Sequence, residues 1–420
     1  MPKKNYNDFS IIYKTEKQFW GILSNGNKKR IKKEKFVLLL KIKKLISYKD
    51  SKIFKKGVTF IILTNKIEVN LNGIRQYVQI LNQASFKYTF IDIFSGAGGL
   101  SQGLIEAGLI PKLCIDNNKD SCKTLLKNHP NVNIVNNKIQ NFNFLKFKNK
   151  VDVLVGGAPC QSFSYAGLKK GLLDSNGSAL LEFIKIIFLI RPKIFVIENV
   201  KGLLSHNKGK TFQYIIELLL KNYIYNIEFE LINMVDYGIP QKRVRLFIVG
   251  SLKSANLPKF FPLPKYYKKQ VLSDVLENVP VSKSTQYPLL KKNLFKKIPQ
   301  GGCWINLPIE DQKKYLGKSF FSGGGKRGIL RRLSMSEPSL TLLCSPSQKQ
   351  TERCHPLEER PLTIRESARI QTFDDNYYFC GTITSQYRQI GNAVPVLFSY
   401  QLGLQLIKIL SFNRKIVEYL

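Results

Sequence analysis

The chain has 420 residues, 44% of them hydrophobic, so it can bury a large core, and Lys or Asn breaks each apolar run before the about 18 residues that a membrane-spanning helix needs. We expect no secretory signal and no membrane association, and the seven scattered cysteines, which lack the spacing of metal ligands, indicate reduced thiols in a cytoplasm without a zinc site. The net charge of +37 predicts a polyanionic partner, although part of the lysine excess is equally expected on the solvated faces of a lysine-rich chain.

Residues 1–87 form a basic extension of mixed strand and helix character. Three roles remain open for it: a DNA-binding regulator, an interaction module, or a segment without a function. We favour a weak contact with DNA or with a partner.

Residues 88–250 alternate strand-like and helix-like segments, the rhythm of a doubly wound α/β sheet. Strands are expected at 88–94, 112–116, 132–135, 151–155 and 193–198, and helices at 100–107, 119–128, 178–190 and 211–222. Two further strand-like runs, 226–233 and 244–250, have no helix between them, so we expect an antiparallel hairpin at one edge of the sheet. Such a Rossmann-like sheet is the architecture of many methyltransferases.

The first strand runs into a glycine-rich turn at Phe94–Leu100, ahead of a helix. Glycines let the backbone of such a turn approach a bound nucleoside closely. A dinucleotide fingerprint needs glycine where Ser101 stands, which argues against NAD. Asp116 ends the next strand about 20 residues later, where it can accept hydrogen bonds from ribose hydroxyls. The alternative is a plain tight turn without a ligand.

A single thiol, Cys160, follows the buried-looking run 151–155 and the pair Gly156-Gly157. This context places it on a tight loop at the C-terminal edge of a strand, where open α/β sheets bind ligands. Cys160 is therefore a candidate nucleophile. The alternative, a small buried hydrophobe, is what most free cysteines are.

A carboxylate and two arginines follow at the ends of later strands. Glu198 lies at the end of the strand expected to neighbour the Cys160 strand, so both groups should face one crevice. The period of two in a strand sends Gln241, Arg243 and Arg245 to one face. Arginine is rare before position 240 and then clusters as far as Arg388, which suggests sites where a bidentate fork binds phosphate or guanine.

Residues 251–330 differ in character, with repeated Pro, Lys-Lys pairs and a triple glycine at 323–325. They predict a smaller, loop-rich domain. Regular structure resumes in the segment 331–420, where Thr363 and Glu366 have capping-box spacing ahead of a helix through Phe373. A long closing helix is expected over 393–410.

These segments, in this order, resemble the DNA cytosine-5 methyltransferase family of bacterial restriction-modification systems, over about residues 88–411. The blocks that carry the resemblance are Asp92–Gly99, Pro159-Cys160-Gln161, Glu198-Asn199-Val200, Gln241–Arg245 and Gln389–Pro395. The resemblance implies a catalytic domain at 88–250, a target-recognition domain at 251–330, and a C-terminal segment that returns to complete the cofactor pocket.

The resemblance also implies the chemistry. Cys160 attacks C6 of a flipped-out cytosine, Glu198 contacts N3 and the amino group and supplies a proton, and C5 takes the methyl group of S-adenosylmethionine. Arg245 binds the cytosine O2, and Arg243 supports the loop or a phosphate. The implied cofactor-binding residues are Phe94, Gly96, Gly98, Gly99, Leu100, Asp116, Asn117, Pro159, Asn392 and Val394.

Two positions depart from the family pattern. Asn117 stands where the family usually has an aromatic residue that stacks on adenine, and Asn137 or Lys138 stands where it usually has an Asp that accepts the adenine amino group. Cys160, Glu198 and Arg245 show no departure.

Two other functions remain open. A tRNA cytosine-5 methyltransferase shares this core, but its Cys-Phe-Thr tripeptide is absent from the sequence. A DNA-binding regulator on the same fold would have lost catalysis, whereas the catalytic residues here are intact. We therefore expect a cytoplasmic, monomeric enzyme that acts on double-stranded DNA, paired with a restriction endonuclease, and uses no metal.

Overall fold

The computed structural model describes residues 88–158, 177–261, 263, 269–321, 328–346, 348 and 352–412, together with the backbone of four strands in the first 87 residues. The chain divides into two compact units, Met1–Tyr77 and Val78–Leu420. The first unit contains an antiparallel sheet of strand order β3-β2-β1-β4. Its strands are β1 (Phe9–Lys14), β2 (Phe19–Leu23), β3 (Lys28–Ile31) and β4 (Thr59–Ile62).

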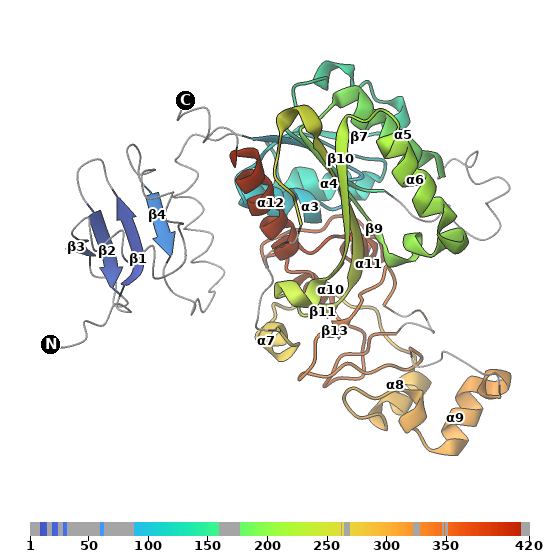
Figure 1. Cartoon of the computed structure of the whole chain (residues 1–420). Coiled ribbons are helices and arrows are strands. Elements are labelled where there is room, and N and C mark those ends of the chain that lie inside the picture. Colours follow the sequence, from blue (N-terminus) through green and yellow to red (C-terminus); the bar gives the residue numbers. More distant parts are fainter. Residues whose placement is uncertain are drawn as a thin grey trace. The chain divides into compact units, whose positions relative to one another are not determined.

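The second unit is built on a seven-stranded sheet of order β10-β12-β9-β8-β5-β6-β7 (Figure 1). The five strands from β9 to β7 in this order are parallel, and β12 runs antiparallel to both β9 and β10. The predicted α/β class and its antiparallel edge hairpin are therefore confirmed. The strands are β5 (Thr89–Ile93), β6 (Ile110–Asp116), β7 (Ile134–Asn136), β8 (Val153–Gly157), β9 (Ile194–Val200), β10 (Tyr225–Asn233) and β12 (Val244–Leu252).

Helices cover both faces of this sheet, as a buried parallel sheet requires. On one face the main apolar cluster joins the strands to α5 (Gly177–Ile190) and α6 (Lys210–Leu220). On the other, α3 (Gly99–Glu106) packs against α12 (Val396–Leu410), where the backbone of α12 approaches Gly103 so closely that a Cβ there would clash. With α4 (Lys119–Asn128), the elements predicted for 88–250 are all present, with ends within two residues of the prediction.

The long closing helix predicted over 393–410 is present as α12, which begins three residues later than predicted, after Pro395. A further helix that was not predicted, α11 (Ile383–Asn392), precedes it and ends before Ala393. Proline disfavours helical backbone in the residue before it, here Val394, so the chain breaks at this point. The apolar stretch Ile383–Leu410 is long enough to cross a membrane by composition, but 72% of its most apolar window is buried inside the fold, as in a core helix.

A smaller part of the second unit has its own apolar core, centred on Phe295 and Leu330. It contains α8 (Leu289–Lys296) and α9 (Ile309–Leu316), so the predicted loop-rich segment also holds short helices. Beside it lie α7 (Ser273–Leu276) and α10 (Ile364–Ile370), and β11 (Gln241–Lys242) pairs with β13 (Ser339–Leu340). The predicted capping box of Thr363 and Glu366 is confirmed at α10, which ends three residues before Phe373.

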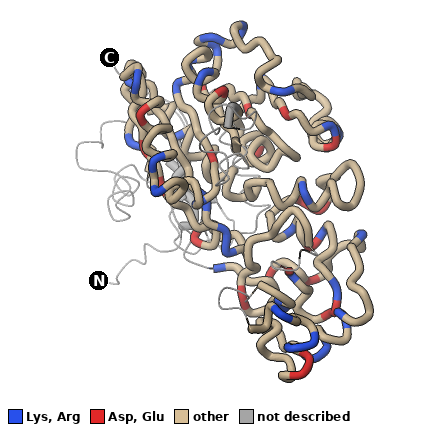
Figure 2. The backbone as a smooth tube through the Cα atoms, turned by 90° about the vertical axis from the view of Figure 1, so that its right-hand side faces the viewer, with Lys and Arg blue, Asp and Glu red and all other residues tan. Residues whose placement is uncertain are grey.

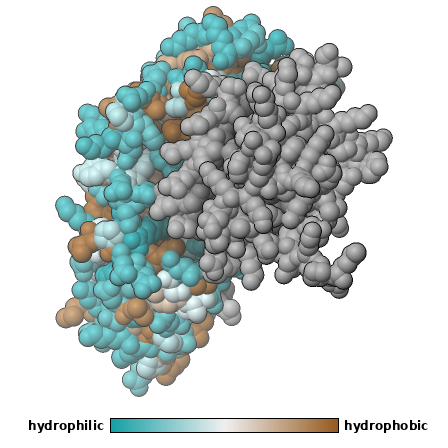
Figure 3. Space-filling model, turned by 90° about the vertical axis from the view of Figure 1, so that its left-hand side faces the viewer, coloured by the Kyte–Doolittle hydropathy of each residue, from teal (hydrophilic) through white to brown (hydrophobic). Residues whose placement is uncertain are grey.

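Charge is spread over this unit, since Lys and Arg occur on many separate segments of both its sheet-containing part and its smaller part (Figure 2). On the described surface that Figure 3 shows, hydrophilic residues predominate and hydrophobic residues occur in small separate groups. Hydrophobic residues scattered in this way are ordinary on a protein surface and do not by themselves mark an interface.

Candidate active site

The predicted cofactor turn has unusual backbone geometry. Phe94 has φ 59°, a left-handed conformation that is uncommon for a non-glycine residue, and Gly96 and Gly98 follow with φ 53° and 87°. Such conformations cluster at ligand sites because the surrounding structure must enforce them. A side chain at Gly99 would collide with the carbonyl oxygen of Val394, so the closing segment lies directly against the turn.

Asp116 lies at the end of β6, beside the turn. Its Oδ2 accepts a hydrogen bond from the Gly96 amide at 2.9 Å, and its Oδ1 accepts one from the Asn118 amide at 2.8 Å. Burial raises the pKa of this carboxyl, and the two amides act against that rise. A carboxylate has about four acceptor positions, so Asp116 can still accept bonds from the two hydroxyls of a ribose.

A second carboxyl, Asp92, lies beneath the turn with no exposed surface. It accepts a short hydrogen bond from the Ser101 hydroxyl, which also contacts the Cys114 thiol at 3.3 Å. Its other oxygen, Oδ1, has no hydrogen-bond partner among the described residues. Burial raises the pKa of Asp92 to about 7.

The other end of the site is formed by β9 and β12. Arg245 Nε lies 3.0 Å from Glu198 Oε1, and both side chains are largely buried, with 15% and 11% of their surfaces exposed. Asn199 donates a hydrogen bond from its Nδ2 to the carbonyl of Ala158 at 3.2 Å. It thereby ties β9 to the start of the segment that carries Pro159 and Cys160. These two predicted site residues lie outside the described residues.

Arg243, predicted to support the loop or a phosphate, is 1% exposed. Its Nη1 donates to the carbonyls of Gly391 at 3.1 Å and of Leu342 at 3.5 Å, so it contacts the backbone of α11 and of the segment that follows β13. Burial, and after it the nearby Arg245, lower the pKa of Arg243 to about 9.

Two buried glutamine side chains, Gln241 and Gln371, also join the arginine segment to the closing segment. From the sequence, only Gln241 was singled out. Gln241 donates to Gln371 at 2.9 Å, and Gln371 donates to the carbonyls of Ile390 at 2.7 Å and Ala393 at 3.1 Å. The arginine segment and the closing segment are therefore fixed to each other. Gln371 follows the capped helix α10, and its burial was not readable from the sequence pattern.

Tyr377 is a further residue that the sequence reasoning missed. It is buried, and its hydroxyl donates to the carbonyl of Ala97, inside the glycine turn, at 2.6 Å. The adjacent Gly98 leaves room for this hydroxyl, because a Cβ there would lie 2.8 Å from it. The available sequence signal was the run of aromatic residues in 373–379, of which Phe373, Tyr377 and Phe379 pack in one cluster.

These elements enclose a cleft of about 720 Å³ at the carboxyl ends of the strands. It brings together Glu198, Arg243 and Arg245 with most of the predicted cofactor residues. The predicted residues that line it at the cofactor end are Phe94, Gly96, Gly99, Leu100, Asp116, Asn117, Asn392 and Val394. Among the described residues, Gly98 shapes the turn without lining the cleft, and neither Asn137 nor Lys138 lines it.

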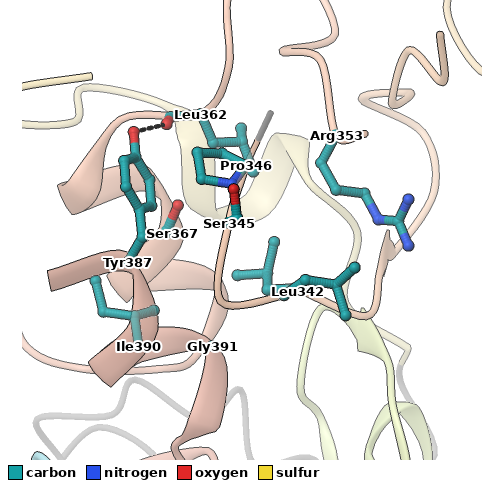
Figure 4. Close-up of a pocket in the computed structure, with 10 residues that line it drawn as sticks. Leu342, Ser345, Pro346, Arg353, Leu362, Ser367, Tyr387, Ile390 and Gly391 are labelled. Carbon is teal, nitrogen blue, oxygen red and sulfur yellow. Dashed lines mark hydrogen bonds between the residues drawn. The ribbon is translucent and has the colours of Figure 1, made fainter. Parts of the chain in front are cut away.

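A much smaller cavity of about 20 Å³ lies behind Gly391, lined by Leu342, Pro346 and Tyr387 among others (Figure 4). The Tyr387 hydroxyl points away to the Leu362 carbonyl, to which it donates at 2.6 Å. This volume holds about one water molecule, so the larger cleft is the candidate active site.

Residues 88–408 match the family model described as C-5 cytosine-specific DNA methylase. The chain is 44% identical to the Type II methyltransferase M.PspPI of Psychrobacter sp. (strain TA137), over 78% of this chain and 81% of that protein. It is 44% identical to the Type II methyltransferase M.Eco47II of Escherichia coli, over 77% and 79% of the two chains. The solved structure of the Entamoeba histolytica methyltransferase EhMeth has a similar fold, with a TM-score of 0.56 and 21% identity, over 77% of this chain and 99% of that one.

Proposed function

Because this chain belongs to the C-5 cytosine-specific DNA methylase family, we propose that it methylates C5 of a flipped-out cytosine in a specific DNA duplex through a covalent bond from Cys160 to C6. The family is S-adenosylmethionine-dependent, and the relatives are methyltransferases of Type II restriction-modification systems. The covalent bond, the residue roles and the cellular role are the parts that we propose.

The observation that carries the proposal is the ion pair of Glu198 and Arg245 at 3.0 Å, within the cleft and beside the strand that leads to Cys160. A carboxyl and a guanidinium side by side present the donor and acceptor pattern that the O2, N3 and amino edge of cytosine requires. Ala158 also lines this cleft and precedes Cys160 by two residues in the sequence.

The chemistry explains why a thiol is needed. The C5 carbon of cytosine is too weakly nucleophilic to attack a methyl sulfonium. When the Cys160 thiolate adds to C6 and Glu198 delivers a proton to N3, the electrons of the C5–C6 double bond become available at C5. After methyl transfer a base removes the C5 proton, the double bond re-forms, and the C6–S bond breaks to release the Cys160 thiolate, while N3 returns its proton to Glu198.

The residues present fit S-adenosylmethionine, which supplies an electrophilic methyl group when bound. The left-handed turn from Phe94 to Gly98 exposes backbone to a ligand, and Asp116 keeps acceptor positions for the ribose. Asn117 and Asn118 line the cleft near this acid, so amide groups take the place of the usual aromatic contact to the adenine.

The substrate base must leave the helical stack to reach this cleft, at a cost of a few kcal/mol. We place the enzyme in the cytoplasm as a monomer, where methylation protects DNA from a restriction endonuclease of the same sequence specificity.

The test is the Cys160→Ser variant, assayed with labelled cofactor on DNA whose methylated sequence is first mapped by bisulfite sequencing. A hydroxyl is far less ionised than a thiol near neutral pH, so methyl transfer should be abolished while DNA binding persists. Turnover near the wild-type rate would remove Cys160 from the mechanism.

A further inference from the structure

One face of α11 lines the active-site cleft. Ser385, Arg388 and Asn392 are spaced three and four residues apart, so they lie on the same side of the helix, and all three line the cleft. The opposite side, with Tyr387 and Ile390, is buried in the protein core. Arg388 is thus an exposed residue that the helix presents to the cleft.

The charged side chains that line the cleft include more arginines than carboxylates. Arg243 donates to backbone carbonyls and Arg245 pairs with Glu198. Arg388 pairs with none of the residues that the structure describes. The three arginines of the cleft thus outnumber its two carboxylates, Glu198 and Asp116, and this excess of positive charge favours an anionic ligand.

Arg388 lies toward the cytosine end of the cleft. Arg243 donates to the carbonyl of Gly391 at 3.1 Å, and Gly391 follows Arg388 by three residues on α11. About one turn of α11 therefore separates Arg388 from the arginine segment that also carries Arg245. Arg388 therefore belongs with the base-binding pair rather than with Asp116 at the ribose end.

We propose that Arg388 binds a phosphate of the DNA backbone next to the flipped cytosine. This inference rests on the proposed function, because it requires the cytosine to enter the cleft between Glu198 and Arg245. The phosphates that flank a flipped nucleotide remain at the mouth of the pocket, and an exposed guanidinium there can bind two phosphate oxygens at once. Such a contact holds the nucleotide in register without reading the base.

The experiment compares wild type with Arg388→Gln and Arg388→Lys variants. DNA binding is measured at several salt concentrations on a duplex that carries the methylated sequence, and binding of S-adenosylhomocysteine is measured separately by calorimetry. For Arg388→Gln, DNA affinity should fall by about tenfold and the slope of log affinity against log salt should become shallower by about 0.9. Arg388→Lys should keep the slope, and cofactor-product binding should be unchanged in both variants.

The matched control is Arg191→Gln. Arg191 is also exposed, but it precedes the N-terminal end of β9, whereas the cleft lies at the carboxyl ends of the strands. Weaker S-adenosylhomocysteine binding with an unchanged DNA slope would overturn the inference and assign Arg388 to the cofactor carboxylate. Equal effects of the Arg388 and Arg191 changes would also overturn it. Methylation of DNA by the wild-type enzyme is measured in the same preparation. If the wild-type enzyme is active, either of these two results refutes only the Arg388 contact. If it does not methylate DNA, the proposed function itself is refuted.

Discussion

Asp92 is a carboxyl group without exposed surface, directly below the cofactor turn. A folded-state pKa of about 7, raised by burial from 3.8, means that the folded protein keeps a proton that the unfolded chain releases. The stabilisation from this group is complete below the unfolded pKa and is lost as the pH rises through 7.

The Asp92→Asn variant should therefore lose less stability than wild type between pH 5 and pH 8. The difference in the free energy of unfolding should change by up to about 1.4 kcal/mol per pH unit, measured by denaturant titration at each pH. Parallel pH profiles for wild type and Asp92→Asn would show that Asp92 does not titrate in this range.

Asp152 should show the opposite pH dependence of stability, because Lys193 and Thr89 outweigh its burial and hold its pKa low. For Asp152→Asn the difference from wild type in the free energy of unfolding should appear at neutral pH and vanish as the pH falls through that lowered pKa.

At the scale of elements, the sequence pattern located the strands and helices of 88–250 because each is long and regularly patterned. It missed α11 and began α12 three residues early, although Thr382 caps α11 by accepting from the Ser385 amide. Arg243 and Gln371 were not recognisable as partners of the closing segment, because their burial depends on contacts that span 148 and 19 residues. Periodicity reports which side of one element is apolar, but it does not report which distant loop covers a polar group.

The segment that follows α10 should act on cofactor binding through Tyr377. Removing its hydroxyl in Tyr377→Phe leaves the Ala97 carbonyl without this donor and loosens the glycine turn. A hydrogen bond of this kind contributes about 1 kcal/mol, so S-adenosylhomocysteine affinity should fall by about fivefold, with kcat preserved at saturating cofactor.

The control is Tyr378→Phe, since Tyr378 is adjacent in sequence and 56% exposed. Calorimetric titration of both variants separates the two positions. Equal affinities for Tyr377→Phe and Tyr378→Phe would mean that the turn holds its shape without the Tyr377 hydroxyl.

At the scale of the whole molecule, we place sequence specificity in residues 251–330 and in Arg331, which follows them; Arg327, within this range, lies outside the described residues. Exchanging this segment for that of a relative should change the methylated sequence, read by bisulfite sequencing, and leave the chemistry intact. Arg332 is 6% exposed and donates to the carbonyls of Phe295 and Pro356, so its contacts are structural. An exchange that leaves the methylated sequence unchanged would move recognition to another part of the chain.

The chain has a net charge of +37, and among the described residues Lys and Arg occur on many separate segments (Figure 2), of which we expect DNA to contact only some. We expect the salt dependence of DNA binding to correspond to roughly 5–10 phosphate contacts. Deleting residues 1 to about 85 should weaken binding modestly and spare the methylated sequence, because the cleft is built from residues 94–394. A truncated protein that fails to fold, or that methylates a different sequence, would make the N-terminal unit an integral part of the enzyme.

The central claim, a covalent bond between Cys160 and C6 of cytosine, is tested most directly with DNA that carries 5-fluorocytosine at the target position. Fluorine cannot leave C5 as a proton does, so the final elimination is blocked and the enzyme should remain attached to the DNA. We predict a complex that resists denaturant, forms only with S-adenosylmethionine present, and is absent with Cys160→Ser. A denaturant-resistant complex with Cys160→Ser, or none with the active wild-type enzyme, would contradict the account.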